Sequence, residues 1–197
     1  MSLLIETISC VDGKLQNLFW HTARVNRSRS LLFESSNRLT LDKTTVPDFV
    51  QSGKWKCRVI YDKKINGVSF EPYISKEVNS FRLVESDINY NHKYEDRRAI
   101  DELFKQRGDA DEIIIVKNGF ITDTSIANIL LFDGKDWITP ETPILFGTMR
   151  AELLSKKAIV AKPVPIIELY NYEKIMLVNA MNPFDLDRAI DIKSSVK

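Results

Sequence analysis

Two residues of the sequence, Lys93 and Asp123, carry side chains that can do chemistry, and they bracket one continuous stretch of the chain. A lysine amine can act as a nucleophile or carry a proton, and a carboxylate can favour a neighbouring positive charge. Asp123 follows the apolar pair Phe120-Ile121 closely, and a carboxylate in apolar surroundings is costly without a cation or a hydrogen-bond donor. Taken singly, the lysine suits a solvated surface and the aspartate the end of a strand. Their significance therefore depends on the elements that position them.

A helix and a strand are predicted directly after Lys93. Residues 94–106 carry apolar side chains at near-helical spacing, with charged residues on the other faces, which indicates an amphipathic helix. Gly108 ends this pattern, and residues 112–116 form a short apolar run that is typical of a strand.

A hairpin is predicted to carry the aspartate. The pair Asn118-Gly119 favours a type I′ turn, because both residues readily adopt positive φ angles. The turn leads into a second strand over residues 120–132. Asp123 and Asn128 are therefore expected on one strand of an antiparallel sheet.

A small α+β domain is predicted for residues 1–76, and a larger, β-rich domain for residues 77–197. Asp12-Gly13 and Asn66-Gly67 are expected to form the tight turns of the first domain. Its strands and helix are expected at residues 4–11, 15–19, 21–33, 56–61 and 68–73. The second domain is expected to include further strands at residues 81–85 and 174–178.

A candidate anion site lies where a helix is predicted to begin, between Gly147 and Thr148. Prolines and a glycine precede this helix, which is expected to run to about Lys157. The first amides of a helix have no internal acceptor, and the positive end of the helix dipole lies there. The backbone from Gly147 to Met149 is therefore predicted to bind an anionic group.

The composition excludes several functional classes. The chain has 197 residues, with 28 basic and 27 acidic residues and a net charge of +1, which provides no electrostatic footprint for nucleic acid or a membrane. No apolar run approaches a membrane span and no signal peptide is recognised, so a cytoplasmic protein is expected. Cys10 and Cys57 are expected to be reduced thiols, and no metal site is predicted.

Four motifs in sequence resemble the class IV aminotransferases, which are pyridoxal-phosphate enzymes of fold type IV. The motifs are His21-Thr-Ala-Arg24, Lys93 before a helix, Asp123-Thr-Ser-Ile-Ala-Asn128-Ile-Leu, and Gly147-Thr-Met-Arg150. The resemblance extends over nearly the whole chain. It implies an α+β fold with a small N-terminal and a larger β-rich C-terminal domain, as in D-amino acid aminotransferase. It also implies pyridoxal 5'-phosphate as cofactor, an active site between the domains, and a homodimer.

The same resemblance implies a role for each motif. Lys93 is expected to be the catalytic residue, which anchors the cofactor covalently and then carries the proton. Asp123 is expected to pair with the pyridine nitrogen, where the family usually has the longer glutamate. Arg24 is expected to bind the cofactor phosphate, because a guanidinium matches its oxygens, and His21 to pack or orient. The remaining residues implied at the phosphate side are Gly147, Thr148, Met149, Asn179 and Ala180.

The expected activity is that of a lyase. The motif Asn179-Ala-Met-Asn-Pro183 is similar to one found in aminodeoxychorismate lyases, which release pyruvate, and Glu6-Thr7 with Asp12-Gly13-Lys14 is similar to their early strand. The substrate is expected to be an amino acid or aminodeoxychorismate. A branched-chain or D-amino acid transaminase, a cofactor-binding protein without catalysis, and a noncatalytic binding module are the alternatives.

Two further features depart from the family pattern. The sequence lacks the family's usual opening segment, so the N-terminal domain is expected to be shortened. The loop Asp62-Lys63-Lys64 is short and basic where D-amino acid aminotransferases place an arginine for the substrate carboxylate. Arg58, Lys63 and Lys64 are equal candidates for that role.

Overall fold

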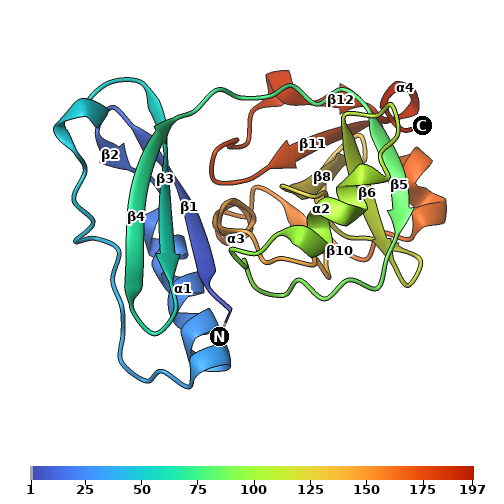
Figure 1. Ribbon diagram of the computed structural model, residues 1–197. Coiled ribbons are helices and arrows are strands. Elements are labelled where there is room, and N and C mark those ends of the chain that lie inside the picture. Colours follow the sequence, from blue (N-terminus) through green and yellow to red (C-terminus); the bar gives the residue numbers. More distant parts are fainter. Residues whose placement is uncertain (1) are drawn as a thin grey trace. The chain divides into compact units, whose positions relative to one another are not determined.

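The computed structural model describes residues 2–197, which fold as two units (Figure 1). Unit 1 comprises Met1–Ser75 and His92–Asp96, and unit 2 comprises Lys76–Asn91 and Arg97–Lys197. The chain thus leaves unit 1, returns to it briefly and leaves it again. Within residues 2–197, no helix has both the length and the apolar character needed to cross a membrane.

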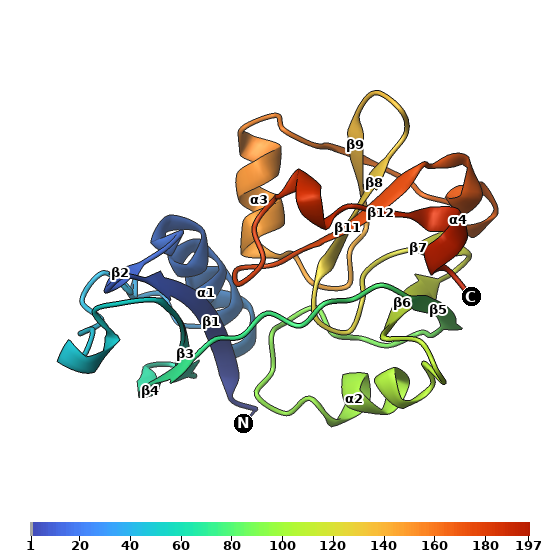
Figure 2. The same ribbon diagram turned by 90° about the horizontal axis from the view of Figure 1, so that it is seen from above.

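An antiparallel sheet forms the centre of unit 1, with the strand order β2-β1-β3-β4. Helix α1 (Leu18–Phe33) lies along one face of this sheet (Figure 2). The other elements of the unit are β1 (Leu4–Val11), β2 (Lys14–Leu15), β3 (Lys54–Tyr61), β4 (Ile65–Pro72) and the 3₁₀ helix η1 (Asp48–Val50).

Alternate side chains of β1 and β3 build the core between the sheet and α1. Leu4 and Ile8 of β1 lie opposite Tyr61 and Cys57 of β3, and all four are buried against apolar residues of the helix. Burying one large aliphatic side chain contributes about 1.5–3 kcal/mol, so this cluster supports the unit. Because side chains alternate along a strand, Glu6 shares the same buried face.

The turns of unit 1 follow the sequence only in part. Asp12-Gly13 has φ angles of 46° and 75°, so the turn predicted between β1 and β2 is confirmed. The prediction of a turn at Asn66-Gly67 is wrong, because both residues lie within β4. The chain reverses earlier, where the Asp62 carboxylate accepts a hydrogen bond from the Lys64 amide at 3.0 Å.

Lys93 lies in the segment that returns to unit 1. Its carbonyl accepts a hydrogen bond from the amide of Ile5 at 2.9 Å. The next residue, Tyr94, forms an antiparallel bridge with Leu4. The segment is thus held along β1 as a short extended piece, which fixes the backbone of Lys93.

Two predicted elements begin or end elsewhere than expected. The helix expected over residues 94–106 is shorter and runs as α2 (Arg98–Lys105), because the residues after Lys93 pair with β1. The strand expected over residues 15–19 ends at Leu15, since Asn17 adopts a left-handed conformation with φ of 57° at the start of α1.

Unit 2 contains a five-stranded sheet in the order β10-β9-β8-β11-β12 and a three-stranded sheet in the order β5-β6-β7. The five-stranded sheet comprises β8 (Asn128–Phe132), β9 (Trp137–Pro140), β10 (Val160–Lys162), β11 (Lys174–Val178) and β12 (Ile190–Asp191). The smaller sheet comprises β5 (Phe81–Glu85), β6 (Glu112–Lys117) and β7 (Phe120–Ile121). The helices besides α2 are α3 (Thr148–Ser155), η2 (Ile166–Asn171), η3 (Leu186–Arg188) and α4 (Ile192–Ser195).

The two faces of β8 and β11 pack against different partners. Leu130 and Met176 lie on one face, in a cluster with Leu153 of α3. Figure 2 shows α3 beside these strands. Ile129 and Leu177 lie on the other face, in a larger cluster that includes residues of β5, β6 and β7. These strands are therefore apolar on both sides, which explains their nearly continuous apolar sequence.

The strand predicted over residues 120–132 is interrupted. The hairpin before it is confirmed, since Asn118-Gly119 has φ angles of 52° and 78°. β7 nevertheless ends at Ile121, and β8 begins only at Asn128. Between them the Thr124 hydroxyl accepts a hydrogen bond from the Ala127 amide at 3.0 Å, a local side-chain contact that competes with the strand ladder.

Candidate functional site

The predicted site residues fall into two groups, one on each unit. Arg24 and Lys93 belong to unit 1. Asp123, Gly147, Thr148, Met149, Asn179 and Ala180 belong to unit 2. Each group is built by different elements and is described in turn.

Asp123 lies in the interruption between β7 and β8 and is only 4% exposed. Its Oδ1 accepts a hydrogen bond from Asn128 Nδ2 at 2.7 Å, and its Oδ2 accepts one from the Leu145 amide at 2.8 Å. Burial raises the pKa of Asp123 to about 6, against the opposing effect of these donors and of Arg150. The carboxylate is therefore buried and held at both oxygens, and its pKa lies closer to neutral pH than that of an exposed aspartate.

Asn128 joins this carboxylate to the start of α3. Its Nδ2 also donates to the Leu145 carbonyl at 2.9 Å. Its Oδ1 lies so close to Gly147 that a β-carbon on that residue would be 1.9 Å away. A β-carbon on Gly147 would therefore require the Asn128 side chain to move, and that side chain contacts both the acid and the segment before the helix.

The start of α3 has the features of an anion site. Gly147 is its N-cap and supplies no side-chain cap hydrogen bond, and the amides of a first helical turn lack intrahelical acceptors. Thr148 is 3% exposed. Arg150 donates to Thr139 Oγ1 at 3.1 Å and to the Pro140 carbonyl at 2.8 Å. The arginine thus ties the helix to the end of β9, and the backbone amides of the first turn are the candidate donors to an anion.

Asn179 builds the turn that follows β11. Its Oδ1 accepts hydrogen bonds from the amides of Met181 and Asn182, both at 2.9 Å. Its Nδ2 donates to the Ile126 carbonyl at 3.2 Å, in the loop that follows Asp123. This turn is thereby connected to the loop that carries the acid.

A buried acid that sequence reasoning missed supports this same loop. Glu112 Oε2 accepts a hydrogen bond from Ser125 Oγ at 2.9 Å, and Arg97 donates to the Ser125 carbonyl at 3.2 Å. Glu112 is 2% exposed, and burial raises its pKa. The signal in the sequence was an acidic residue at the head of an otherwise apolar strand.

In unit 1, Arg24 is held by Glu6, another partner that the sequence analysis missed. Arg24 Nε donates to Glu6 Oε1 at 2.9 Å and Arg24 Nη2 to Oε2 at 2.5 Å, while His21 Nδ1 lies 2.6 Å from Oε2. Burial would raise the pKa of Glu6, but Arg24 and His21 lower it to about 2. Burial lowers the pKa of His21. Glu6 is therefore ionised, and His21 favours its neutral form.

The candidate cations for a substrate carboxylate differ in their surroundings. Arg58 on β3 lies 3.6 Å from Glu95, two residues after Lys93. The Lys63 carbonyl accepts a hydrogen bond from the buried Arg29 at 2.6 Å, whereas the Lys63 and Lys64 side chains are exposed.

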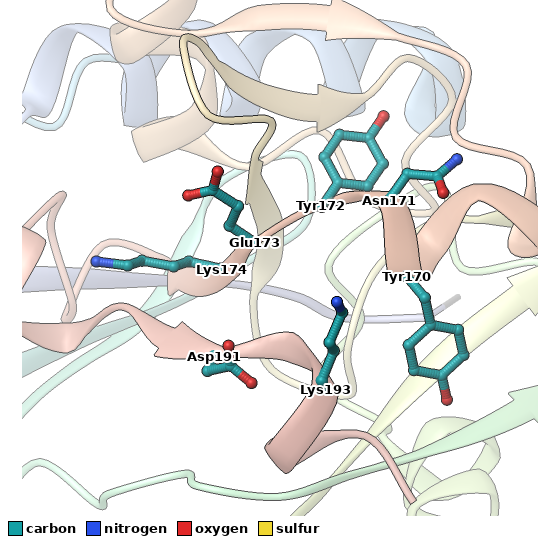
Figure 3. Close-up of a pocket in the computed structure, with 7 residues that line it drawn as sticks. All are labelled: Tyr170, Asn171, Tyr172, Glu173, Lys174, Asp191 and Lys193. Atoms are coloured by element: carbon teal, nitrogen blue, oxygen red, sulfur yellow. The ribbon is translucent and has the colours of Figure 1, made fainter.

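A hollow of about 330 Å³ in unit 2 is separate from the predicted cofactor residues (Figure 3). One of its acids, Asp191, already serves as a helix cap, since its carboxylate accepts a hydrogen bond from the Ser194 amide at 2.9 Å. The hollow is lined by Tyr170, Asn171, Tyr172, Glu173, Lys174, Asp191 and Lys193. In the part of the chain that the structure describes, no group of three or more His, Cys, Asp or Glu residues is arranged to hold a metal ion.

Comparisons with known proteins identify the family to which this chain belongs. The family model described as "Amino-transferase class IV" matches residues 91–184. An uncharacterised Haemophilus influenzae protein is 36% identical over 91% of this chain and 97% of its own. A crystal structure from Haemophilus somnus 129PT, assigned as a candidate 4-amino-4-deoxychorismate lyase, has a TM-score of 0.81 and 33% identity, covering 93% of this chain and 98% of that one.

More distant structures share the fold. A structure described as a hypothetical aminotransferase from Mycobacterium tuberculosis, in its pyridoxal-phosphate-bound form, has a TM-score of 0.77 at 16% identity, covering all of this chain and 81% of that one. A fold IV transaminase from Curtobacterium pusillum has a TM-score of 0.75 at 18% identity, covering all of this chain and 79% of that one. The chain therefore has the α+β architecture of the fold type IV enzymes. It belongs to the class IV aminotransferase family.

Proposed function

We propose that this protein is a pyridoxal-phosphate-dependent carbon–nitrogen lyase that acts on aminodeoxychorismate and releases pyruvate. The observation that carries the proposal is the cluster of Asp123, Asn128 and Gly147, which joins a buried acid to the helix start that is the candidate phosphate site. Support for the lyase comes from the Haemophilus somnus relative. The motif that begins at Asn179-Ala180 supports the same subfamily.

The donor set of the chain fits the cofactor by its chemistry. Asp123 offers a carboxylate to a ring nitrogen, and the backbone from Gly147 to Met149 offers amides to a phosphate. Arg24 offers a guanidinium to the same phosphate, and Lys93 offers an amine to the aldehyde. When bound, pyridoxal phosphate supplies an electron-withdrawing ring that stabilises negative charge at the substrate's α-carbon.

The residues then divide the work. Lys93 would hold the cofactor through its amine and, when that amine is free, would carry a proton between atoms of the substrate. Asp123 favours the protonated ring nitrogen by placing an opposite charge within hydrogen-bond range. Asn128 and the Leu145 amide keep that carboxylate oriented.

Cofactor binding is tested by visible absorption spectra of the wild type and of Lys93→Ala after addition of pyridoxal phosphate. We expect the absorption band of lysine-bound cofactor in the wild type and no such band in the variant. Lys105→Ala is the matched control, because Lys105 is exposed and pairs only with Glu102 on α2. Borohydride reduction followed by peptide mass mapping identifies the modified lysine. Modification elsewhere would refute the assignment of Lys93.

The reaction is tested by incubating the enzyme with aminodeoxychorismate in the absence of any 2-oxo acid. Pyruvate should form under these conditions, because a lyase needs no acceptor. Turnover that depends on an added 2-oxo acid would instead identify a transaminase for branched-chain or D-amino acids. Binding of the cofactor without turnover of any amino substrate would identify a member that has lost catalysis.

The assembly is proposed from the family alone. We expect a cytoplasmic homodimer, as the sequence analysis implied. Light scattering coupled to size-exclusion chromatography, over a range of protein concentrations, should give twice the chain mass of 22.7 kDa. A monomer at all concentrations would refute this part of the proposal.

A further inference from the structure

Glu6 is a buried charged residue of unit 1 to which the proposed function assigns no role. Its side chain is fully buried on the face of β1 that also carries Leu4 and Ile8. An ionised carboxylate in such surroundings is strongly unfavourable unless cations and donors compensate for the lost water. Arg24 and His21 together supply three contacts to its two oxygens. Both partners come from α1, so the carboxylate connects the strand to the helix.

The hydrogen bonds to Glu6 use Nε and Nη2 of Arg24 and do not involve its third nitrogen, Nη1. A guanidinium is planar and rigid, so fixing Nε and Nη2 on a carboxylate also fixes the direction of Nη1. Arg24 Nη1 makes no hydrogen bond to any residue from 2 to 197, and the side chain is 14% exposed. The strand residue Glu6 therefore determines where the remaining donor edge of Arg24 points.

The charges explain what Glu6 contributes. Ionised Glu6 and Arg24 together carry no net charge, and buried His21 adds none when it donates Nδ1–H to the carboxylate as a neutral ring. The pair therefore attracts a distant anion less than a lone arginine would. The pair can still bind a nearby anion in a defined orientation, because the two N–H bonds of Nη1 are held in a fixed geometry.

We propose that Glu6 is a positioning residue for phosphate recognition, which holds Arg24 so that Nη1 donates to the phosphate of the cofactor. This inference rests on the proposed function, since it assumes that pyridoxal phosphate is the ligand. It leads to a specific expectation. Glu6 should matter for a phosphorylated ligand and should matter little for pyridoxal, which has the same ring and aldehyde without the phosphate.

The test measures the dissociation constants of pyridoxal phosphate and pyridoxal for the wild type, Glu6→Gln and Arg24→Lys. We expect both variants to weaken binding of pyridoxal phosphate by roughly tenfold to a hundredfold, the range for loss of a charge-assisted hydrogen bond. Binding of pyridoxal should change by less than about threefold, because it lacks the group that Arg24 contacts. Arg24→Lys keeps the charge but has only one nitrogen, which we expect to remain on Glu6.

The double variant Glu6→Gln with Arg24→Lys tests whether the two residues act together. Its loss in affinity for pyridoxal phosphate should be no larger than that of either single variant, because both changes remove the same interaction. Additive losses would overturn the proposal. Glu71→Gln is the matched control, since Glu71 lies on the same sheet, is exposed and pairs with Lys56.

Each remaining outcome also decides the question. Equal weakening of both ligands by Glu6→Gln would assign Glu6 a structural role and overturn the inference. If Glu6→Gln does not fold, Glu6→Asp keeps an ionised partner for Arg24 and shortens its reach, and an unchanged preference for pyridoxal phosphate in that variant would overturn it. Failure of the wild type to bind either ligand would refute the proposed function itself, which is a different result.

Discussion

The side-chain oxygen of Asn128 occupies the space that a β-carbon on Gly147 would fill, with a separation of only 1.9 Å. Gly147 has φ of −71°, so its backbone conformation is open to any residue, and the requirement for glycine comes from this contact alone. The same Asn128 side chain binds Asp123. A side chain at Gly147 is therefore expected to displace Asn128 and to disturb its hydrogen bond to Asp123.

Gly147→Ala should destabilise the protein by about 1–3 kcal/mol, as overpacking typically does, and should also weaken cofactor binding because Asn128 must move. Urea unfolding gives the first quantity and titration with pyridoxal phosphate the second. Gly67→Ala is the control, since no atom lies within 4 Å of a β-carbon placed there. Equal behaviour of the two variants would show that the Asn128 contact is unimportant.

Asp123 should give the cofactor-free protein a distinctive dependence of stability on pH. Its pKa is raised from 3.8 to about 6 by burial, so between these values the folded state binds more protons than the unfolded state. The free energy of unfolding should therefore fall as pH rises through this window, by up to about 3 kcal/mol for a shift of this size. Below the unfolded pKa the contribution of Asp123 is fully present.

The comparison of wild type with Asp123→Asn isolates that effect. Burial lowers the pKa of His21, which raises stability as pH rises, and Glu6, whose pKa is about 2, loses its contribution only below its unfolded value of 4.5. Both contributions are common to the two proteins and cancel in the difference. In urea unfolding from pH 4.5 to 8, the free energy of unfolding of the wild type should fall relative to that of Asp123→Asn as the pH rises. Parallel curves for the two proteins would contradict the raised pKa.

Local patterns in the sequence were sufficient for most elements. The strand at residues 4–11 and the hairpin at Asn118-Gly119 occur as predicted, because alternation and turn chemistry act between near neighbours. The site depends on more distant pairing. Arg24 was recognised as a candidate phosphate ligand, but its bond to Glu6 joins a helix to a strand, and no local pattern indicates it.

The course of the chain around the predicted lysine shows the same limit. The helical spacing that begins at Tyr94 predicts a helix directly after Lys93, yet Tyr94 bridges to Leu4 at the other end of the sequence. Likewise, the hydroxyl of Thr124 ends the strand ladder after Asp123, where the apolar pattern predicted continuity. In both places a contact that periodicity does not encode overrides it.

The contact between Ser125 and Glu112 should stabilise the loop that follows Asp123. Ser125→Ala removes a donor to a buried carboxylate, and we expect a loss of about 1.5–3 kcal/mol, the range for a hydrogen bond to a charged group. Hydrogen exchange should be faster at the amides of residues 124–127 and unchanged in unit 1. Ser155→Ala is the control, because Ser155 donates only to an exposed carbonyl of its own helix. Uniformly faster exchange over the whole chain would show global destabilisation instead.

Arg29 should prove essential for unit 1 although it has no role in the proposed chemistry. It is 1% exposed, and its two terminal nitrogens donate to the Asn37 carbonyl at 2.8 Å, to Asn37 Oδ1 at 2.9 Å and to the Lys63 carbonyl at 2.6 Å. These bonds tie α1 to the loop after it and to the β3–β4 turn. Because the fork of a guanidinium reaches several acceptors at once, a lysine cannot replace it.

Arg29→Lys is therefore expected to lower the free energy of unfolding by about 1.5–3 kcal/mol, the range for lost hydrogen bonds to a charged group. Arg38→Lys provides the comparison, since Arg38 is exposed in the neighbouring loop. The loss should appear in the urea midpoint followed by tryptophan fluorescence, to which Trp55 on β3 and Trp20 on α1 contribute from unit 1. A midpoint equal to that of Arg38→Lys would mean that the hydrogen bonds of Arg29 to the two carbonyls contribute no net stability. The buried Arg29 side chain would then contribute through packing alone.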